Sequence, residues 1–405
     1  MKGISTWAAV IIVVIIIVAA AGIFFVMSSQ GGHSSTTTST TSTTSTSSST
    51  STSTTAAPPQ ISASIVAGGS TFVNPAMQVW VKGFQSEYPG IQVTYSSTGS
   101  GAGVNNFLQG AYDIGATDAP PPSNLYQQMT QKYGEILTIP DVVGSEYIIY
   151  NIPGFTGVLN LTPDVIAKIY LGQIQYWDDP AIKALNPNFN FPHQKIIAVH
   201  RSDGSGTTFV FTYWLYISSE AWRSSGVGYG YTVNWPVDQL GNGLGGKGNE
   251  GVTAYVKQNP YSIGYVEAQY AIANNLTGAA VLNPSTGEFV KPSEATIETA
   301  LQNANLTQLP SSLTVDMSNY LSVFMNVKAH NAYPIVSFSW LVVKVNYNDE
   351  SKAKAIYLFL KYIVTTGQTE LPAGYLPLPS NVQQLVLENL KLISYNNKPV
   401  YTMVS

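Results

Sequence analysis

The sequence predicts an α/β fold for the part of the chain that follows residue 60. Short apolar strands alternate there with segments whose apolar residues recur at helical spacing, as an α/β domain requires. Three predicted strands, at 64–67, 91–95 and 112–116, each run into a stretch rich in glycine, hydroxyl or carboxylate side chains. Because ligands bind at the carboxyl ends of strands in open α/β sheets, we expect these stretches to meet at one site.

Each of these strand ends contributes candidate ligand-binding residues. Thr71 and Phe72 follow the first strand, Ser100 follows the second and Asp118 follows the third. Helices are predicted directly after the first two, and Pro75 lies at the start of one of them. Backbone N–H groups at helix starts can bind an anion together with nearby hydroxyls.

A run with the sequence RSDGSGT, which begins at Arg201, has the character of an oxyanion site. Apolar residues at helical spacing follow it and place Ser205, Gly206 and Thr207 in the first helical turn. The free N–H groups and the helix dipole favour an anion there, and Arg201 offers a planar fork to an oxyanion. Asp203 is placed to hold that fork. The same run is also compatible with an ordinary serine-capped helix beside a surface ion pair.

Composition narrows the classes of function. The chain of 405 residues contains no cysteine, has a net charge of -4 and is only 10% charged. Disulfides and thiolate catalysis are therefore excluded, as is the basic surface of a nucleic-acid-binding protein. The four histidines lack the spacing of metal ligands, and no nucleophile elbow with a catalytic triad is present in the sequence. We therefore expect that the chain binds no cofactor and is not an enzyme. The segment 243–248 matches a dinucleotide-binding pattern without a preceding strand, and we expect a glycine-rich loop there.

The first 32 residues predict a signal or membrane anchor. The apolar stretch 7–27 is long enough to cross a bilayer, and Lys2 before it places the globular part on the extracellular side of the cell membrane. The opening MKGIS resembles the archaeal class III, type IV pilin-like signal, in which a peptidase cuts after Gly3 and leaves the apolar helix in place. A cleaved secretory signal is the alternative.

Residues 33–60 are rich in serine and threonine and predict a disordered stalk that carries O-glycans. Sequons at Asn160, Asn275 and Asn305 are candidate N-glycosylation sites, which have meaning only if this part of the chain is extracellular.

Several motifs, in this order, resemble the phosphate-binding proteins of the high-affinity ABC phosphate importers. They are GSTF at 69–72, GSGAGV at 99–104, DIGATDAP at 113–120, RSDGSGT at 201–207, GLGGKGN at 243–249 and IGYVE at 263–267. The resemblance extends over about 65–392. It implies a two-lobed type II periplasmic-binding-protein fold, with one lobe at 62–142 plus 338–405 and the other at 143–337.

The resemblance also implies which residues hold phosphate between the lobes. These are Thr71, Phe72, Ser100, Asp118, Arg201, Ser205, Gly206 and Thr207, with Asp203 supporting Arg201. The chain departs from the family at Gly101, where a second serine is common.

Selectivity is expected to come from Asp118, because a carboxylate accepts a hydrogen bond from protonated phosphate but repels fully ionised sulfate. The expected partners are inorganic phosphate and an ABC transporter permease, with the membrane reached through the N-terminal helix. A receptor for another oxyanion, such as molybdate, and a surface filament or assembly protein remain alternatives.

Overall fold

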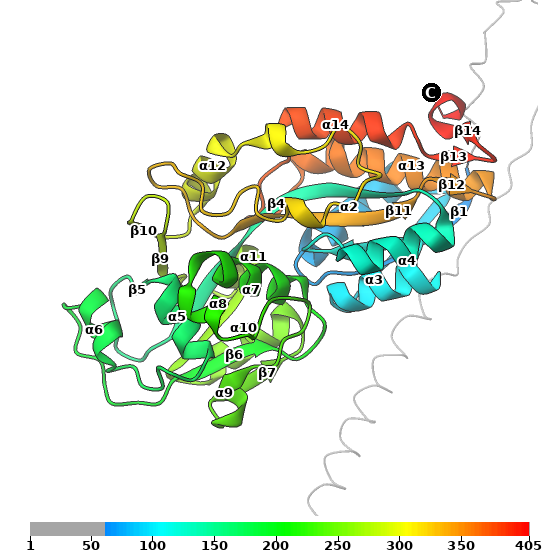
Figure 1. Ribbon diagram of the computed structural model, residues 1–405. Coiled ribbons are helices and arrows are strands. Elements are labelled where there is room, and N and C mark those ends of the chain that lie inside the picture. The colour runs from blue at the N-terminus through cyan, green and yellow to red at the C-terminus, as the bar shows by residue number, and fades with distance from the viewer. Residues whose placement is uncertain (1–60, 405) are drawn as a thin grey trace, which may run out of the picture. The chain divides into compact units, whose positions relative to one another are not determined.

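One eight-stranded sheet organises the residues that the computed structural model describes, 61–404 (Figure 1). Its strands are β1 (Ala63–Gly69), β2 (Ile91–Ser97), β3 (Ile114–Thr117), β4 (Ile136–Asn151), β6 (Ile197–Arg201), β7 (Gly243–Gly246), β8 (Ser262–Glu267) and β11 (Val336–Lys344). They are arranged in the order β2-β1-β3-β11-β4-β8-β6-β7.

Strand β4 joins the two halves of this sheet. Up to Ser145 it pairs antiparallel with β11, and from Glu146 to Asn151 it pairs antiparallel with β8. Every residue of β4 except the last is buried, as expected for a strand that is covered on both faces. The change of partner divides the sheet into a first half, β2-β1-β3-β11, and a second half, β8-β6-β7.

Helices cover both halves (Figure 1). With the first half lie α2 (Asn74–Glu87), α3 (Ser100–Gln109), α4 (Ser123–Tyr133), α12 (Glu294–Asn303), α13 (Glu350–Val364) and α14 (Ser380–Leu390). With the second half lie α5 (Pro163–Tyr170), α6 (Pro180–Leu185), α7 (Gly206–Ser218), α8 (Glu220–Ser224), α9 (Pro236–Gln239), α10 (Gly248–Gln258) and α11 (Ala268–Ala273).

Short elements complete the fold. One small sheet has the order β10-β9-β5, from β5 (Asn160–Leu161), β9 (Ala280–Asn283) and β10 (Glu288–Val290). Another consists of β12 (Asn346–Tyr347), β13 (Ser394–Tyr395) and β14 (Lys398–Pro399). The 3-10 helices are η1 (Leu306–Gln308), η2 (Ser318–Tyr320), η3 (Thr366–Thr369) and η4 (Val400–Met403).

The α/β prediction is confirmed, and the first three predicted strands correspond to β1, β2 and β3. Pro75 lies in the first turn of α2, where its missing N–H costs no helical hydrogen bond. The buried residues of that helix include Met77, Trp80 and Phe84, at the helical spacing that the sequence shows.

The prediction of a glycine-rich loop at 243–248 was wrong. Gly243–Gly246 form the edge strand β7, which pairs parallel with β6, and Gly248 begins α10. A Cβ on Gly246 would lie 2.6 Å from the backbone nitrogen of Val252, so only glycine fits where the strand meets the helix. A strand of glycine and leucine carries no β-propensity signal, which explains why the sequence did not predict it.

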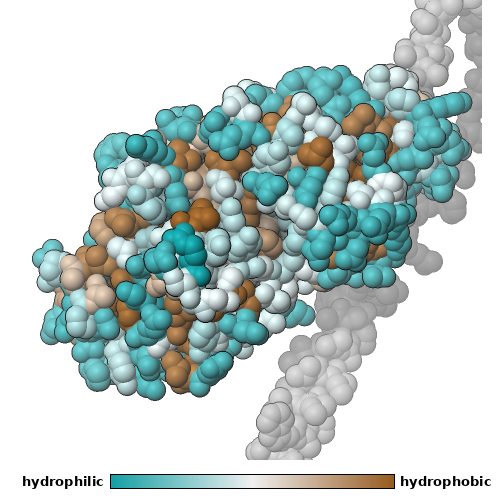
Figure 2. All heavy atoms as spheres, viewed as in Figure 1, coloured by the Kyte–Doolittle hydropathy of each residue, from teal (hydrophilic) through white to brown (hydrophobic). Residues whose placement is uncertain are grey.

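The apolar core extends through both halves of the sheet. Trp80, Trp214 and Trp340 are among its largest fully buried side chains, and they come from α2, α7 and β11. On the face shown in Figure 2, apolar and polar residues are interspersed rather than gathered into one apolar patch.

Within residues 61–404, no helix has the length and apolar character needed to cross a membrane. The predicted anchor at 1–32 and the predicted stalk at 33–60 lie outside the described residues.

Candidate anion-binding site

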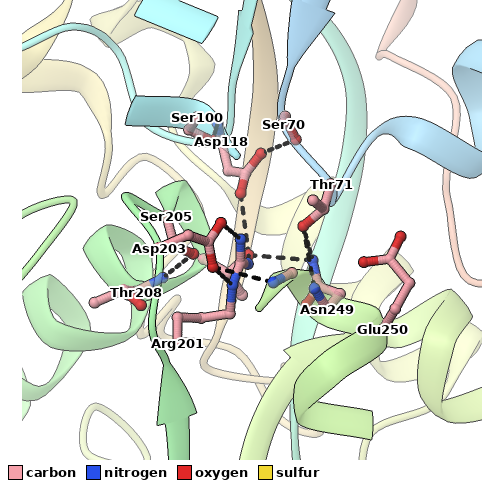
Figure 3. A network of polar contacts seen from close by, with 12 residues as sticks. Ser70, Thr71, Ser100, Asp118, Arg201, Asp203, Ser205, Thr208, Asn249 and Glu250 are labelled. Carbon is pink, nitrogen blue, oxygen red and sulfur yellow. Dashed lines mark hydrogen bonds and ion pairs between the residues drawn. The ribbon is translucent and has the colours of Figure 1, made fainter. Parts of the chain in front are cut away.

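The predicted site residues come together where the two halves of the sheet face each other (Figure 3). From the first half, Thr71 follows β1, Ser100 begins α3 after β2, and Asp118 follows β3. From the second half, Arg201 ends β6 and α7 begins at Gly206. The polar side chains of this group are buried, Asp118 being only 1% exposed and Arg201 only 4%.

Asp118 is the acceptor at the centre of the network. Its carboxylate accepts hydrogen bonds from Ser70 and, at 3.1 Å, from the hydroxyl of Thr207. Its backbone N–H donates to Ser100 Oγ over 3.3 Å. Burial raises the pKa of Asp118 to about 6, although the hydrogen bond from Ser70 and the charge of Arg201 oppose the rise. At neutral pH the group is therefore a charged acceptor with little contact with water.

Arg201 is held by Asp203 through two hydrogen bonds. Its Nε donates to Oδ1 of Asp203 at 2.8 Å, and its Nη2 donates to Oδ2 at 2.6 Å. Burial disfavours both charges, but the pairing outweighs it: the pKa of Arg201 lies above its ordinary value and that of Asp203 lies below. Since the pair occupies one edge of the guanidinium, the Nη1 edge faces Thr207, whose Oγ1 lies 3.3 Å away.

The interpretation of 201–207 as a capped helix beside a surface ion pair is half right. Ser205 is the N-cap of α7, and its Oγ accepts from the Thr208 N–H at 3.0 Å. The ion pair is not at the surface, because the side chains of Arg201 and Asp203 are only 1% and 14% exposed. A buried arginine beside a helix start is a site suited to an anion.

At Gly206 the second half lies very close to the first. A Cβ on Gly206 would lie 2.5 Å from Ser100 Oγ and 2.7 Å from the Asp118 backbone nitrogen. The first turns of α3 and α7 therefore meet with no room for a side chain between them.

The ring of Phe72 packs in the apolar core rather than into the polar network. The ring is fully buried, lies against Gly144 and makes an edge contact with Tyr375 at a centroid distance of 6.3 Å. Its carbonyl accepts from the Tyr375 hydroxyl.

Sequence reasoning missed two polar residues of this network, Ser70 and Asn249. Ser70 precedes Thr71 in the GSTF motif and contacts Asp118 directly. Asn249, the second residue of α10, donates from Nδ2 to Thr71 Oγ1 at 2.9 Å and to Thr207 Oγ1 at 3.4 Å. Asn249 is the last residue of the GLGGKGN motif at 243–249. The motif pointed to this segment but not to the contact that Asn249 makes.

Tyrosines from the second half also reach the first. The hydroxyl of Tyr231 lies 3.1 Å from the Ala119 carbonyl oxygen, and the hydroxyl of Tyr270 donates to the Thr71 carbonyl at 2.6 Å. These contacts link the two halves beside the network.

A cavity of about 200 Å³ adjoins the network. It is lined by Thr71, Ser97, Thr98, Asp203, Lys247, Gly248 and Glu250. Because both halves contribute to its lining, it lies at the seam between them. In the described part of the chain, no group of three or more acidic or histidine side chains is arranged to hold a metal ion.

Comparison with known proteins identifies the family. A family model described as a PBP superfamily domain matches residues 33–366. The phosphate-binding protein PstS of Methanocaldococcus jannaschii is 41% identical over 80% of this chain and 85% of its own length. The PstS of Pasteurella multocida is 36% identical over 80% of this chain and 88% of its own length.

A solved structure of a high-affinity periplasmic phosphate-binding protein, bound with phosphate, has a TM-score of 0.65 to this chain at 18% identity. The match covers 84% of this chain and 97% of that structure, so the two share the periplasmic-binding-protein fold. With this fold, and with the sequence identities above, the chain belongs to the PstS family of phosphate-binding proteins.

Proposed function

We propose that this chain is an extracytoplasmic binding protein that captures inorganic phosphate between the two halves of its fold and delivers it to an ABC transporter permease. The relatives named PstS support the ligand and the transport role. The observation that carries the proposal is the buried set of one arginine, helix starts from both halves and one carboxylate acceptor. Such a set can bind and release an anion.

Each group has a distinct task in this proposal. The N–H groups at the starts of α3 and α7 and the Nη1 edge of Arg201 donate to the phosphate oxygens. The hydroxyls of Thr71 and Ser100 add donors from the first half, and that of Thr207 adds one from the second half when it turns from Asp118 to the ligand. Asp118 accepts a hydrogen bond from the proton that phosphate carries at neutral pH and that sulfate lacks. A site built around such an acceptor rejects the wrong anion by on the order of 10⁴-fold.

We also propose that 62–142 with 338–405 and 143–337 are two lobes that close on the ligand. The partner change of β4 between Ser145 and Glu146 supports a boundary near 142, because the strand then runs from one lobe into the other. Helix α12, although it falls within 143–337, contacts β11 of the first half. Binding drives closure since only the closed form brings both sets of donors to the anion. The N–H of Leu313 donates to Asn389 Oδ1 at 2.8 Å. This hydrogen bond also connects the two proposed lobes.

For the N-terminal part we propose a retained membrane anchor at 1–32, processed after Gly3, and a glycosylated stalk at 33–60. The apolar run and the pilin-like opening of the sequence support the anchor. Mass spectrometry of the native N-terminus tests it: a mature chain that begins at Ile4 agrees with the proposal, and one that begins after the apolar run contradicts it.

Glycans are proposed first at Asn275 and Asn305, whose sequons lie on exposed residues. Asn160 is a weaker acceptor because it is partly buried and its Nδ2 donates to the Leu185 carbonyl at 3.3 Å. Glycopeptide mapping distinguishes the three sites.

Isothermal titration of the full chain with phosphate, sulfate and molybdate tests the proposed ligand. We expect phosphate to bind with an affinity at least 1,000-fold above that of sulfate, on the order set by a buried acceptor. Equal affinities for phosphate and sulfate, or tighter binding of molybdate, would contradict the proposal.

A further inference from the structure

We infer that Asn249 is a positioning residue for phosphate binding, and that it fixes the hydroxyl of Thr71 so that this hydroxyl can only donate to the ligand. The inference rests on the proposed function, because it concerns how a phosphate donor is oriented. It begins from the hydrogen-bonding capacity of the groups involved.

A threonine hydroxyl has one proton to donate and two lone pairs that accept. Both acceptor positions of Thr71 Oγ1 are filled by Asn249, through its backbone N–H at 3.2 Å and its Nδ2 at 2.9 Å. Thr71 is only 4% exposed, so water does not compete freely for its proton. The proton therefore points along the one remaining direction, and an anion oxygen in the site is the acceptor that suits it.

The orientation of the Asn249 amide is fixed independently of Thr71. Its Oδ1 accepts from the backbone N–H of Glu267 at 3.1 Å, which leaves Nδ2 as the end that faces the site. A flipped amide would set its NH₂ group against the Glu267 N–H, donor facing donor, and leave that N–H without a partner. Asn249 is fully buried, and each polar atom of its side chain has a partner.

The second Nδ2 proton reaches the other half of the site. It approaches Thr207 Oγ1 at 3.4 Å, and that hydroxyl in turn donates to Asp118 at 3.1 Å. One amide thus orders a hydroxyl after β1 and a hydroxyl in α7, which belong to different halves of the sheet.

Closure also supplies the cap of α10. The N-cap residue of this helix, Lys247, makes no side-chain capping bond, and the Asn249 N–H instead donates to Thr71 from the other half. Opening the halves removes this acceptor. Asn249 therefore couples the orientation of the phosphate donor to the closed form.

Asn249→Asp is the sharpest test, since it keeps an oxygen for the Glu267 N–H but turns the donor end into an acceptor. Above the pKa of the new carboxyl, Thr71 must give its proton to that carboxylate instead of to phosphate. We expect the affinity for phosphate at pH 7.5 to fall by about 10- to 100-fold, the range for a hydrogen bond to a charged group. In acid the protonated carboxyl donates again, so the loss relative to wild type should shrink at pH 4.5.

The buried Asn283 provides a matched control, because its Nδ2 donates to the Val327 and Ala332 carbonyls away from the site. Asn283→Asp should lower the thermal midpoint of the ligand-free chain but leave the affinity ratio to wild type unchanged with pH. A merely structural role of Asn249 would give that same pattern.

A double-mutant cycle keeps the inference testable if Asn249→Asp folds poorly. Thr71→Val removes the oriented hydroxyl, so adding Asn249→Ala should cost less than about 3-fold further, because residues that act as one unit are not additive. Losses that multiply independently, or a wild-type affinity and pH profile for Asn249→Asp, would overturn the inference. If the wild-type chain itself fails to bind phosphate, the proposed function fails instead.

Discussion

Glu146 lies directly opposite Glu267 at the position where β4 changes its partner from β11 to β8, and both side chains are fully buried. Directly opposed residues of antiparallel strands project from the same face of the sheet. Burial raises the pKa of each carboxyl well above its ordinary value. Since two ionised carboxylates so close together repel each other, the junction between the halves is most stable when at least one of them carries a proton.

Glu146→Gln should therefore stabilise the protein at neutral pH. A carboxyl whose pKa is raised by folding contributes stability that is fully present below its unfolded pKa, about 4.3, and is lost as the pH rises through the folded value. The gain in the free energy of unfolding should be near zero at pH 4 and reach about 1–3 kcal/mol at pH 7.5. Urea denaturation of the ligand-free chain at both pH values measures it.

The exposed Glu298 on α12 provides the control for this prediction. Glu298→Gln should change the free energy of unfolding by less than about 0.5 kcal/mol at either pH. A gain from Glu146→Gln that is the same at pH 4 and pH 7.5 would contradict a pKa of Glu146 that folding raises.

Gly206→Ala should prevent closure without unfolding the chain. The added methyl group would meet Ser100 Oγ at 2.5 Å and the Asp118 backbone nitrogen at 2.7 Å, both across the seam. We expect phosphate affinity to fall by about 5- to 150-fold, since overpacking at a close contact costs about 1–3 kcal/mol. Gly230→Ala is the control, because the nearest atom to its Cβ lies 3.5 Å away. Phosphate binding by Gly206→Ala with wild-type affinity would show that the halves do not approach there.

Arg201→Lys should lose most of the phosphate affinity although the charge remains. Among residues 61–404, Arg201 is the only lysine or arginine that is buried, with 4% of its surface exposed. An ammonium group cannot bind Asp203 through two atoms and still present a planar edge to the anion. Calorimetry should show a loss of about 100-fold or more, as for a charge-assisted pair of hydrogen bonds. A loss below about 5-fold would show that only the charge matters.

Much of the site could be predicted from the sequence because its parts are local patterns. Thr71, Ser100 and Asp118 each follow a strand, and Ser205 caps a helix whose apolar spacing is plain. The position of each at a strand end then suffices to bring them together.

Contacts between segments that are distant in the sequence leave no local sequence pattern of this kind. Asn249 and Thr71 are 178 residues apart, and Asn249 follows a glycine strand without β-propensity. Glu146 is one of two carboxylates in the mainly apolar strand β4, and only the register of β4 against β8 shows that it is buried opposite another carboxyl. Register and long-range pairing are tertiary properties that residue spacing does not contain.

The discrimination between phosphate and sulfate in wild type and in Asp118→Asn tests the central claim most directly. At pH 7.5, above the pKa of about 6 that burial gives Asp118, the carboxylate should make wild type prefer phosphate by at least about 1,000-fold. In Asp118→Asn the amide can donate to either anion, so the ratio should fall below about 10-fold. A wild-type chain that binds both anions equally, or a variant that keeps the full preference, would contradict the assignment of Asp118 as the group that selects phosphate.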